Sequence, residues 1–341
     1  MTSQLAAPTR VVATRTTNRK PGPVSYLWLV WRQHGGMLVT AVVVTLGLCG
    51  TLLYTGRMLS SLHCTPYPRV FVGAYSPGGC SAVASWNLHL YETARWSLRA
   101  VVALPALLGV FWGAPLVSRE HETGTYGLAW GQGVTARQWL RGKLLVLGAL
   151  SSLLCLATWL CARPVAESLS RLEYVGRFGW EAFDTLAPLT VGYALAALAL
   201  GVLCSVVTRT TVPALVLAAV VCLGLGVGTA DVLRPHYLPA TVAHYPAAED
   251  SPPFSQTALY LTYNGWADAA GQPTDFFPRQ CLQPTDPCLR EHGISGRISV
   301  YQPASREAEL QLIEAGLALL VAAGCVVLAV AFVGRGFGAA R

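Results

Sequence analysis

The sequence predicts an all-α membrane protein with six transmembrane helices, an N-terminal interfacial elbow helix and an extracellular cap between helices five and six. Six apolar runs are each close to the roughly 20 residues that a helix needs to cross a hydrocarbon core about 30 Å thick. Of the 341 residues, 53% are hydrophobic and only 12% are charged, which is too little charge to cover a soluble protein of this length. The basic residues are also concentrated on one side of the predicted topology.

The chain divides into two tails, an elbow and a transmembrane domain. We expect a flexible cytoplasmic tail at residues 1–23, the elbow helix at 24–36, the transmembrane domain at 37–334 and a second cytoplasmic tail at 335–341. A soluble protein with long buried helices is the alternative, but it would need amphipathic helices, and these are apolar on every face. No charged residue lies near the middle of any of the six runs, which cover residues 37–56, 100–117, 144–161, 188–207, 214–232 and 315–334.

The elbow segment combines aromatic and aliphatic residues at helical spacing. Leu27 and Trp31 recur on one face, and Trp28 and Trp31 would anchor the helix at the level of the lipid headgroups. The two glycines at 35–36 would let the chain turn into the first crossing. Alternatively, Trp28 and Trp31 begin one long, tilted first helix.

Charge predicts which loops face the cytoplasm. Residues 1–20 carry four basic residues but no apolar stretch or cleavage site, so we expect no signal peptide and a cytoplasmic N-terminus. Six crossings then place residues 118–143, 208–213 and the C-terminus inside, and they place the loops 57–98, 162–187 and 233–314 outside. The inner segments hold 12 of the 24 basic residues and only two of the 17 acidic ones, which is the positive-inside pattern. This topology and contact with anionic lipid explain the net charge of +7, so we expect no nucleic-acid partner.

The ten cysteines fall into two groups. Six lie in or beside apolar runs, where a thiol behaves as a small hydrophobic group. Cys64, Cys80, Cys281 and Cys288 lie in the outer loops, and an even number there suggests two disulfides. We favour the pairs Cys64–Cys80 and Cys281–Cys288, because near partners close with less loss of entropy, although bonds between the two loops are an alternative. A zinc site is disfavoured, since neither pair has CxxC spacing.

The loop at 118–143 is the only inner loop long enough to bind a partner. Gly124 would end the second helix, and Thr135 with Gln138 is a capping-box signature for the start of the third. Apolar side chains such as Trp130 lie between them in a glycine-rich stretch. They indicate a contact surface for another protein, and partial burial in lipid headgroups is the alternative.

The sequence contains no catalytic motif. It has no phosphate-binding loop, dinucleotide fingerprint or histidine cluster, so we expect neither enzymatic activity nor a cofactor or metal in this chain. Arg99, Asp231 and Glu314 lie at outer helix ends, where we expect water and headgroups to solvate them. Small residues predict close helix packing, within one protomer or between two; they are Ala197, Gly201 and Ser205 in the fourth helix and Gly224 and Gly228 in the fifth.

Four segments resemble a bacterial ABC-2-type transporter permease. They are WRQHGG at 31–36, LLGVFWGAPLVSREHETGTYGLAWGQGVTARQWLRGK at 107–143, RPHYLPA at 234–240 and YQPASR at 301–306. After YQPASR such permeases commonly continue with bulky aromatic residues, whereas here Glu307, Ala308, Glu309 and Leu310 follow. This departure concerns how the cap meets the membrane and leaves the topology unchanged.

The resemblance implies a partner and an energy source. In that family two permease subunits, identical or related, enclose the pathway, and a separate ABC ATPase docks on the inner loop between helices two and three. ATP and magnesium would therefore bind the partner, and the coupling surface would include Arg119, Glu120, Glu122, Trp130 and Arg137. The chain would be a multi-pass protein of the bacterial cell membrane with both termini in the cytoplasm.

We therefore expect the membrane-spanning permease subunit of an ATP-driven ABC exporter. It would move an apolar or amphipathic compound outward, using ATP hydrolysed by a separate nucleotide-binding subunit. The alternative is a membrane immunity or sensor protein that does not transport and binds a ligand through its extracellular cap.

Overall fold

The computed structural model describes residues 23–63, 87–124, 135–172, 183–185, 187–246, 258–275, 281 and 286–336. Six helices among them are long and apolar enough to cross a membrane, which confirms the expected number. These spans are Gly35–Ser61, Leu88–Glu122, Ala136–Leu169, Pro188–Thr208, Thr211–His236 and Glu307–Gly334.

The first three spans are built from α1 (Pro23–Ser61), α3 (Leu88–Leu108), the π-helical turn η1 (Gly109–Gly113), α4 (Pro115–Glu122) and α6 (Ala136–Leu172). The second span consists of α3, η1 and α4 in series. The prolines at positions 105 and 115 donate no backbone N–H, and the widened π turn lies between them, where the regular hydrogen-bond ladder is interrupted.

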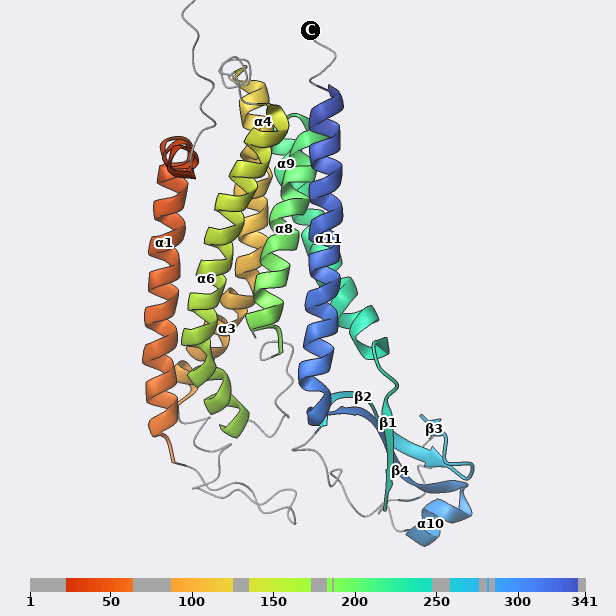
Figure 1. Ribbon diagram of the computed structural model, residues 1–341. Coiled ribbons are helices and arrows are strands. Elements are labelled where there is room, and N and C mark those ends of the chain that lie inside the picture. The colour runs from red at the N-terminus through yellow and green to blue at the C-terminus, as the bar shows by residue number, and fades with distance from the viewer. Residues whose placement is uncertain are drawn as a thin grey trace, which may run out of the picture.

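The elbow segment is helical and continuous with the first span. Figure 1 shows the first turns of α1 viewed along their axis, whereas the rest of α1 runs down the page, so the helix changes direction. Trp31 is exposed, and the side chain of Trp28 lies outside the described residues. The interfacial position of this segment stays a prediction.

The other three spans comprise α8 (Ala187–Thr208), α9 (Thr211–Val227) with the π turn η2 (Gly228–Leu233) and the 3₁₀ turn η3 (Arg234–His236), and α11 (Glu307–Gly336). α8 is the central helix: 67% of the residues in its most apolar stretch are buried, against 11% in the span formed by α9. α9 is therefore peripheral.

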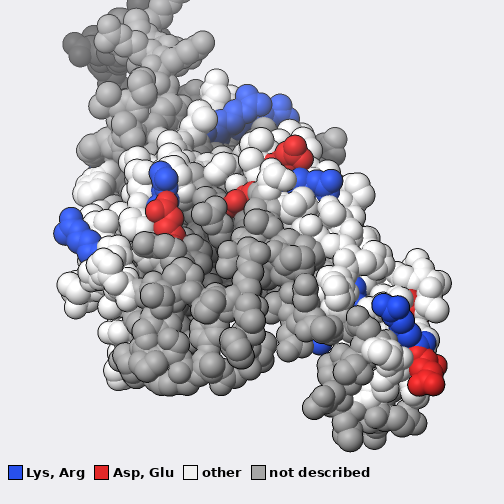
Figure 2. All heavy atoms as spheres, turned by 90° about the horizontal axis from the view of Figure 1, so that it is seen from below, with Lys and Arg blue, Asp and Glu red and all other residues white. Residues whose placement is uncertain are grey.

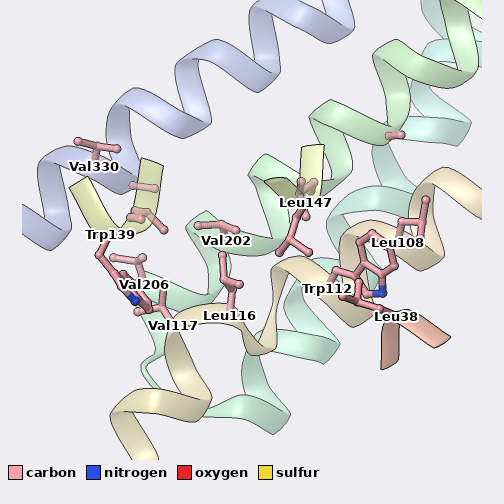
Figure 3. Close-up of a cluster of buried hydrophobic side chains, with 14 of the residues drawn as sticks. Leu38, Leu108, Trp112, Leu116, Val117, Trp139, Leu147, Val202, Val206 and Val330 are labelled. Atoms are coloured by element: carbon pink, nitrogen blue, oxygen red, sulfur yellow. The ribbon is translucent and has the colours of Figure 1, made fainter. Parts of the chain in front are cut away.

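The core of the bundle is packed mainly around α8. Val202 lies against Leu116 and Leu147, and Trp112 lies beside Leu108 in the same cluster (Figure 3). Leu108 and Leu116 flank the π turn and Trp112 lies within it, so the interrupted helix is held in place by burial before, within and after the turn.

The cap contains a four-stranded antiparallel sheet of order β1-β4-β2-β3. The prediction of an all-α protein was therefore incomplete. The prolines of this segment disfavour long helices, and stretches such as ISVY in its last strand suit a pleated, half-buried surface. The elements are β1 (Thr241–Tyr245), β2 (Ala258–Asp268), β3 (Pro273–Thr274), α10 (Asp286–Glu291), β4 (Ile294–Pro303) and η4 (Ala304–Arg306).

The cap lies beyond the N-terminal end of α11, to one side of the bundle (Figure 1). We call this end of the bundle the outer end and the opposite end, where α4 and the C-terminus lie, the inner end. The view from below shows acidic and basic residues next to each other on the cap (Figure 2). A disulfide joins Cys281 to Cys288 beside the buried side chains of Leu289 and Ile294.

Candidate functional site

A cavity of about 1280 Å³ lies between α3, α8, α9 and α11, and it extends towards the cap. Its walls are largely apolar. Side chains that line it include Val102, Ala106, Leu200, Cys222, Leu317 and Val321. A space of this size and character suits an apolar or amphipathic molecule.

Charged residues meet at the outer end of the cavity. Arg234 donates from Nη2 to Asp184 Oδ1 at 2.5 Å and to Glu314 Oε1 at 2.8 Å, and from Nε to Glu314 Oε2 at 3.0 Å. Tyr193 donates a hydrogen bond to Glu314, and the guanidinium carbon of Arg234 lies 4.4 Å from the centre of the Phe183 ring. We call Asp184, Tyr193, Arg234 and Glu314 the outer cluster. It joins the segment before α8, α8 itself, the end of the fifth span and α11.

The prediction for Glu314 was wrong. We expected solvation at a helix end, but the side chain is 1% exposed and forms two ionic hydrogen bonds with Arg234. Of the other two residues grouped with it, Asp231 is exposed at the cavity wall, and Arg99 stacks on Trp96 at 4.6 Å. A sequence separation of 80 residues gives no local signal that Arg234 and Glu314 are partners.

Burial raises the pKa of the Asp184 carboxyl to about 6, well above its usual range. Loss of hydration is the main cause. Glu314 raises the pKa further, while Arg234 opposes the rise. At pH 7 the carboxyl is therefore mostly ionised, and at pH 5 it is mostly protonated.

This shift predicts a pH-dependent contribution to stability. The pKa of Asp184 is higher in the folded state than the ordinary 3.8. Its contribution to the free energy of unfolding is therefore complete below pH 3.8 and is lost as the pH rises through about 6. We expect the wild type to gain stability relative to Asp184→Asn between pH 7 and pH 4, by at most about 3 kcal/mol at roughly 1.4 kcal/mol per pKa unit. Thermal unfolding in lipid nanodiscs measures the difference, and a difference that does not change with pH would contradict the assignment.

The small residues of the predicted fourth helix, which is α8, form a close contact with the second span. The oxygen of Ser205 accepts hydrogen bonds from the backbone N–H groups of Val117, at 3.1 Å, and Ser118, at 2.7 Å. At Gly201, an added Cβ would lie 2.9 Å from the backbone nitrogen of Ala114. The predicted small-residue face therefore packs within the protomer. A Cβ on Gly224, in α9, or on Gly228, the first residue of η2, would meet no described atom within 4 Å, so that pair faces open space.

Two of the predicted coupling residues bind neighbours at the inner end. Lys143 Nζ donates to Glu120 Oε1 at 2.5 Å, which ties the start of α6 to α4. Glu122 accepts hydrogen bonds from the backbone nitrogen of Thr211, at 2.9 Å, and from its hydroxyl, at 2.6 Å, which ties α4 to the start of α9. Both carboxylates therefore hold helices of the chain itself together.

Three further coupling candidates form no part of these two contacts. Arg119 and Arg137 are exposed, and the guanidinium of Arg137 lies over the backbone of Gly334 near the end of α11. Trp130 lies outside the described residues. Thr135 and Gln138 form the reciprocal capping-box bonds at the start of α6, both at 3.3 Å. The inner end thus brings α4, α6, α9 and α11 together around the ends of the 118–143 segment.

The outer cysteines offer no free metal ligands in the described part of the chain. Cys281, Cys288 and His292 have ligand atoms within 4.8 Å of one another, but the disulfide occupies both sulfur atoms. The proposed Cys64–Cys80 pair falls in residues that the structure leaves undescribed.

Two of the quoted sequence segments meet where the cap joins the bundle. Gln302 donates to the carbonyl of Leu238 at 2.7 Å, and Arg306 donates to that of Pro239, also at 2.7 Å. Arg234, in the same segment as Leu238 and Pro239, belongs to the outer cluster. The segments at 234–240 and 301–306 therefore form one junction at the N-terminal end of α11.

The comparison with protein families decides what kind of membrane protein this is. Residues 37–234, more than half of the chain, match the family described as ABC-2 membrane transporter related. The chain belongs to this family. It is thus an ABC-2-type permease, a class of transmembrane transport subunits rather than ATPases. The match ends at Arg234, so the cap and the sixth span lie beyond it. No curated protein and no solved structure matches the permease.

Proposed function

We propose that the permease is the membrane subunit of an ATP-driven exporter that moves an apolar or amphipathic compound outward. The observation that carries this proposal is the family match together with the largely apolar cavity between α3, α8, α9 and α11. ATP and magnesium would bind a separate ABC ATPase, since such permeases have none of that chemistry themselves. A second permease subunit, identical or related, would complete the pathway, in a bacterial cell membrane with both termini in the cytoplasm.

The inner end is the proposed coupling site. Glu120 and Lys143 join the two ends of the 118–143 segment, and Glu122 links α4 to α9, which forms one wall of the cavity. A force applied to this segment by an ATPase would therefore reach α4, α6 and α9 together. The exposed Arg119 and Arg137 are the described side chains best placed for direct contact with the partner.

The test is association with an ATPase after reversal of charge at this surface. We expect the permease to co-purify with an ABC ATPase encoded beside it, and the double variant Arg119→Glu/Arg137→Glu to recover at least about tenfold less of it, because the approaching charges no longer match. Arg163→Glu is the matched control, since Arg163 is an exposed arginine near the outer end of α6. Equal recovery from both variants would contradict the coupling role.

The second candidate function is a membrane immunity or sensor protein that binds its ligand through the cap. It is favoured by the disulfide-linked, folded cap, which exceeds what a simple loop between helices requires. This function would give no ATPase on co-purification, and removal of ATP would leave ligand binding unchanged.

A further inference from the structure

The charges that line the cavity do not balance. Three acidic residues and two basic ones contribute to its wall, and the buried part has the same acidic excess. There, one guanidinium faces two carboxylates, so the outer cluster carries a net charge of −1 when all three groups are ionised. Arg234 is 6% exposed and Glu314 is 1% exposed, so bulk water screens this charge only weakly.

The hydrogen bonds of the cluster also leave capacity for a ligand. Asp184 and Glu314 each accept one of the two N–H groups on Nη2 of Arg234, so this nitrogen has no hydrogen left for a further acceptor. Tyr237 lines the same cavity, and its buried hydroxyl has no hydrogen-bond partner in the described part of the chain. A buried excess charge and an unsatisfied hydroxyl both carry a free-energy cost that a suitable ligand would reduce.

We propose that the cavity binds an amphipathic organic cation. Its charged group would lie beside the carboxylates of Asp184 and Glu314, where the aromatic rings of Tyr193 and Tyr237 add attraction for a cation. Its apolar body would extend along the walls formed by α3, α9 and α11. This inference names the chemical class of the exporter's cargo, and it rests on the proposed function only in treating the bound cation as cargo. The binding site itself does not require an ATPase.

The test compares two ions of nearly the same size and shape and of opposite charge. Tetraphenylphosphonium and tetraphenylborate are titrated separately into the purified permease in nanodiscs of zwitterionic lipid, and binding to empty nanodiscs is subtracted. We expect saturable binding of the cation that is at least about tenfold tighter than binding of the anion, because the charge lies in a low-dielectric site. Equal binding of the two ions, or no binding of the cation, would overturn the proposal; the latter is expected if a helix of a second copy fills the cavity.

Variants then locate the site. Glu314→Gln removes the excess charge and should weaken cation binding about tenfold without weakening anion binding. Glu309→Gln is the matched control, because Glu309 is an exposed carboxylate on the same helix that does not line the cavity. Unchanged cation binding in Glu314→Gln would overturn the proposal.

A measurement on the wild type avoids any effect of the variants on folding. Between pH 7.5 and pH 5, Asp184 takes up a proton while facing Arg234, Glu314 and Tyr193, and the cluster loses its excess charge. Cation affinity should then fall about tenfold with a midpoint near pH 6, and anion affinity should not fall. A cation affinity that is constant over this range would overturn the proposal. If the permease binds the cation selectively but recruits no ATPase, the exporter function is rejected and the cation-binding site is retained.

Discussion

Glu120→Met is expected to destabilise the permease by about 3–5 kcal/mol, because it leaves the ammonium of Lys143 buried without a counter-charge. The side chain of Lys143 is 0% exposed, and its ammonium lies 4.2 Å from the centre of the Trp139 ring. A cation–π contact is worth about 2 kcal/mol when desolvated, which is less than an unpaired buried charge costs. Thermal or denaturant unfolding in nanodiscs, followed by circular dichroism, measures the loss.

Substitution of the partner lysine should cost less stability, and the difference between the two losses tests the geometry of the ion pair. Lys143→Met leaves the carboxylate of Glu120, which is 14% exposed and can recover contact with water. We expect a loss of about 1.5–3 kcal/mol, the value of a charged hydrogen bond. The double variant Glu120→Met/Lys143→Met should be close to the wild type, since apolar residues of similar volume often replace a buried ion pair without loss.

Arg141→Met provides the control for this series. Arg141 is an exposed basic residue on the same helix, two positions from Lys143, and its loss should change stability by no more than about 0.5 kcal/mol. A Glu120→Met variant as stable as Arg141→Met would show that the ion pair does not hold α4 to α6.

The features that were predicted from sequence depend on neighbouring residues. Six crossings follow from the length and apolar character of each run, and the capping box of Thr135 and Gln138 lies within four residues. Likewise, the small face of Ala197, Gly201 and Ser205 is a helical repeat that can be recognised without knowing its partner. In each case the determining interactions are local or involve the bilayer, whose properties are known in advance.

The features that were missed depend on contacts between distant segments. Arg234 and Glu314 each lie near the end of an apolar run, and nothing local distinguishes a buried ion pair from two solvated charges. The resemblance to ABC-2-type permeases placed Glu120 on the coupling surface, and its ion pair with Lys143, at the far end of the 118–143 segment, was not predicted. The sheet of the cap was missed because its strands pair across prolines and irregular segments, so alternation is short and interrupted.

Gly201→Ala is expected to destabilise the permease by about 1–3 kcal/mol, although alanine ordinarily stabilises a helix relative to glycine. A Cβ at this position would lie 2.9 Å from the backbone nitrogen of Ala114 and 3.0 Å from Cα of Gly113, and closer still to the carbonyl oxygen of Gly109. These are backbone atoms, so they cannot rotate away as a flexible side chain would. The second span and α8 would have to separate.

The same substitution at Gly224 is the matched control. No described atom would lie within 4 Å of its new Cβ, so Gly224→Ala should be neutral or stabilising by up to about 1 kcal/mol. Unfolding of the two variants under identical conditions therefore isolates the effect of helix contact from that of helix propensity. Because Ala197, which lies over Gly109, also lines the cavity, a separation of these helices would reshape the proposed binding site as well. Equal stability of the two variants would mean that α8 and the second span are not in backbone contact, and the cavity wall would have to be redrawn.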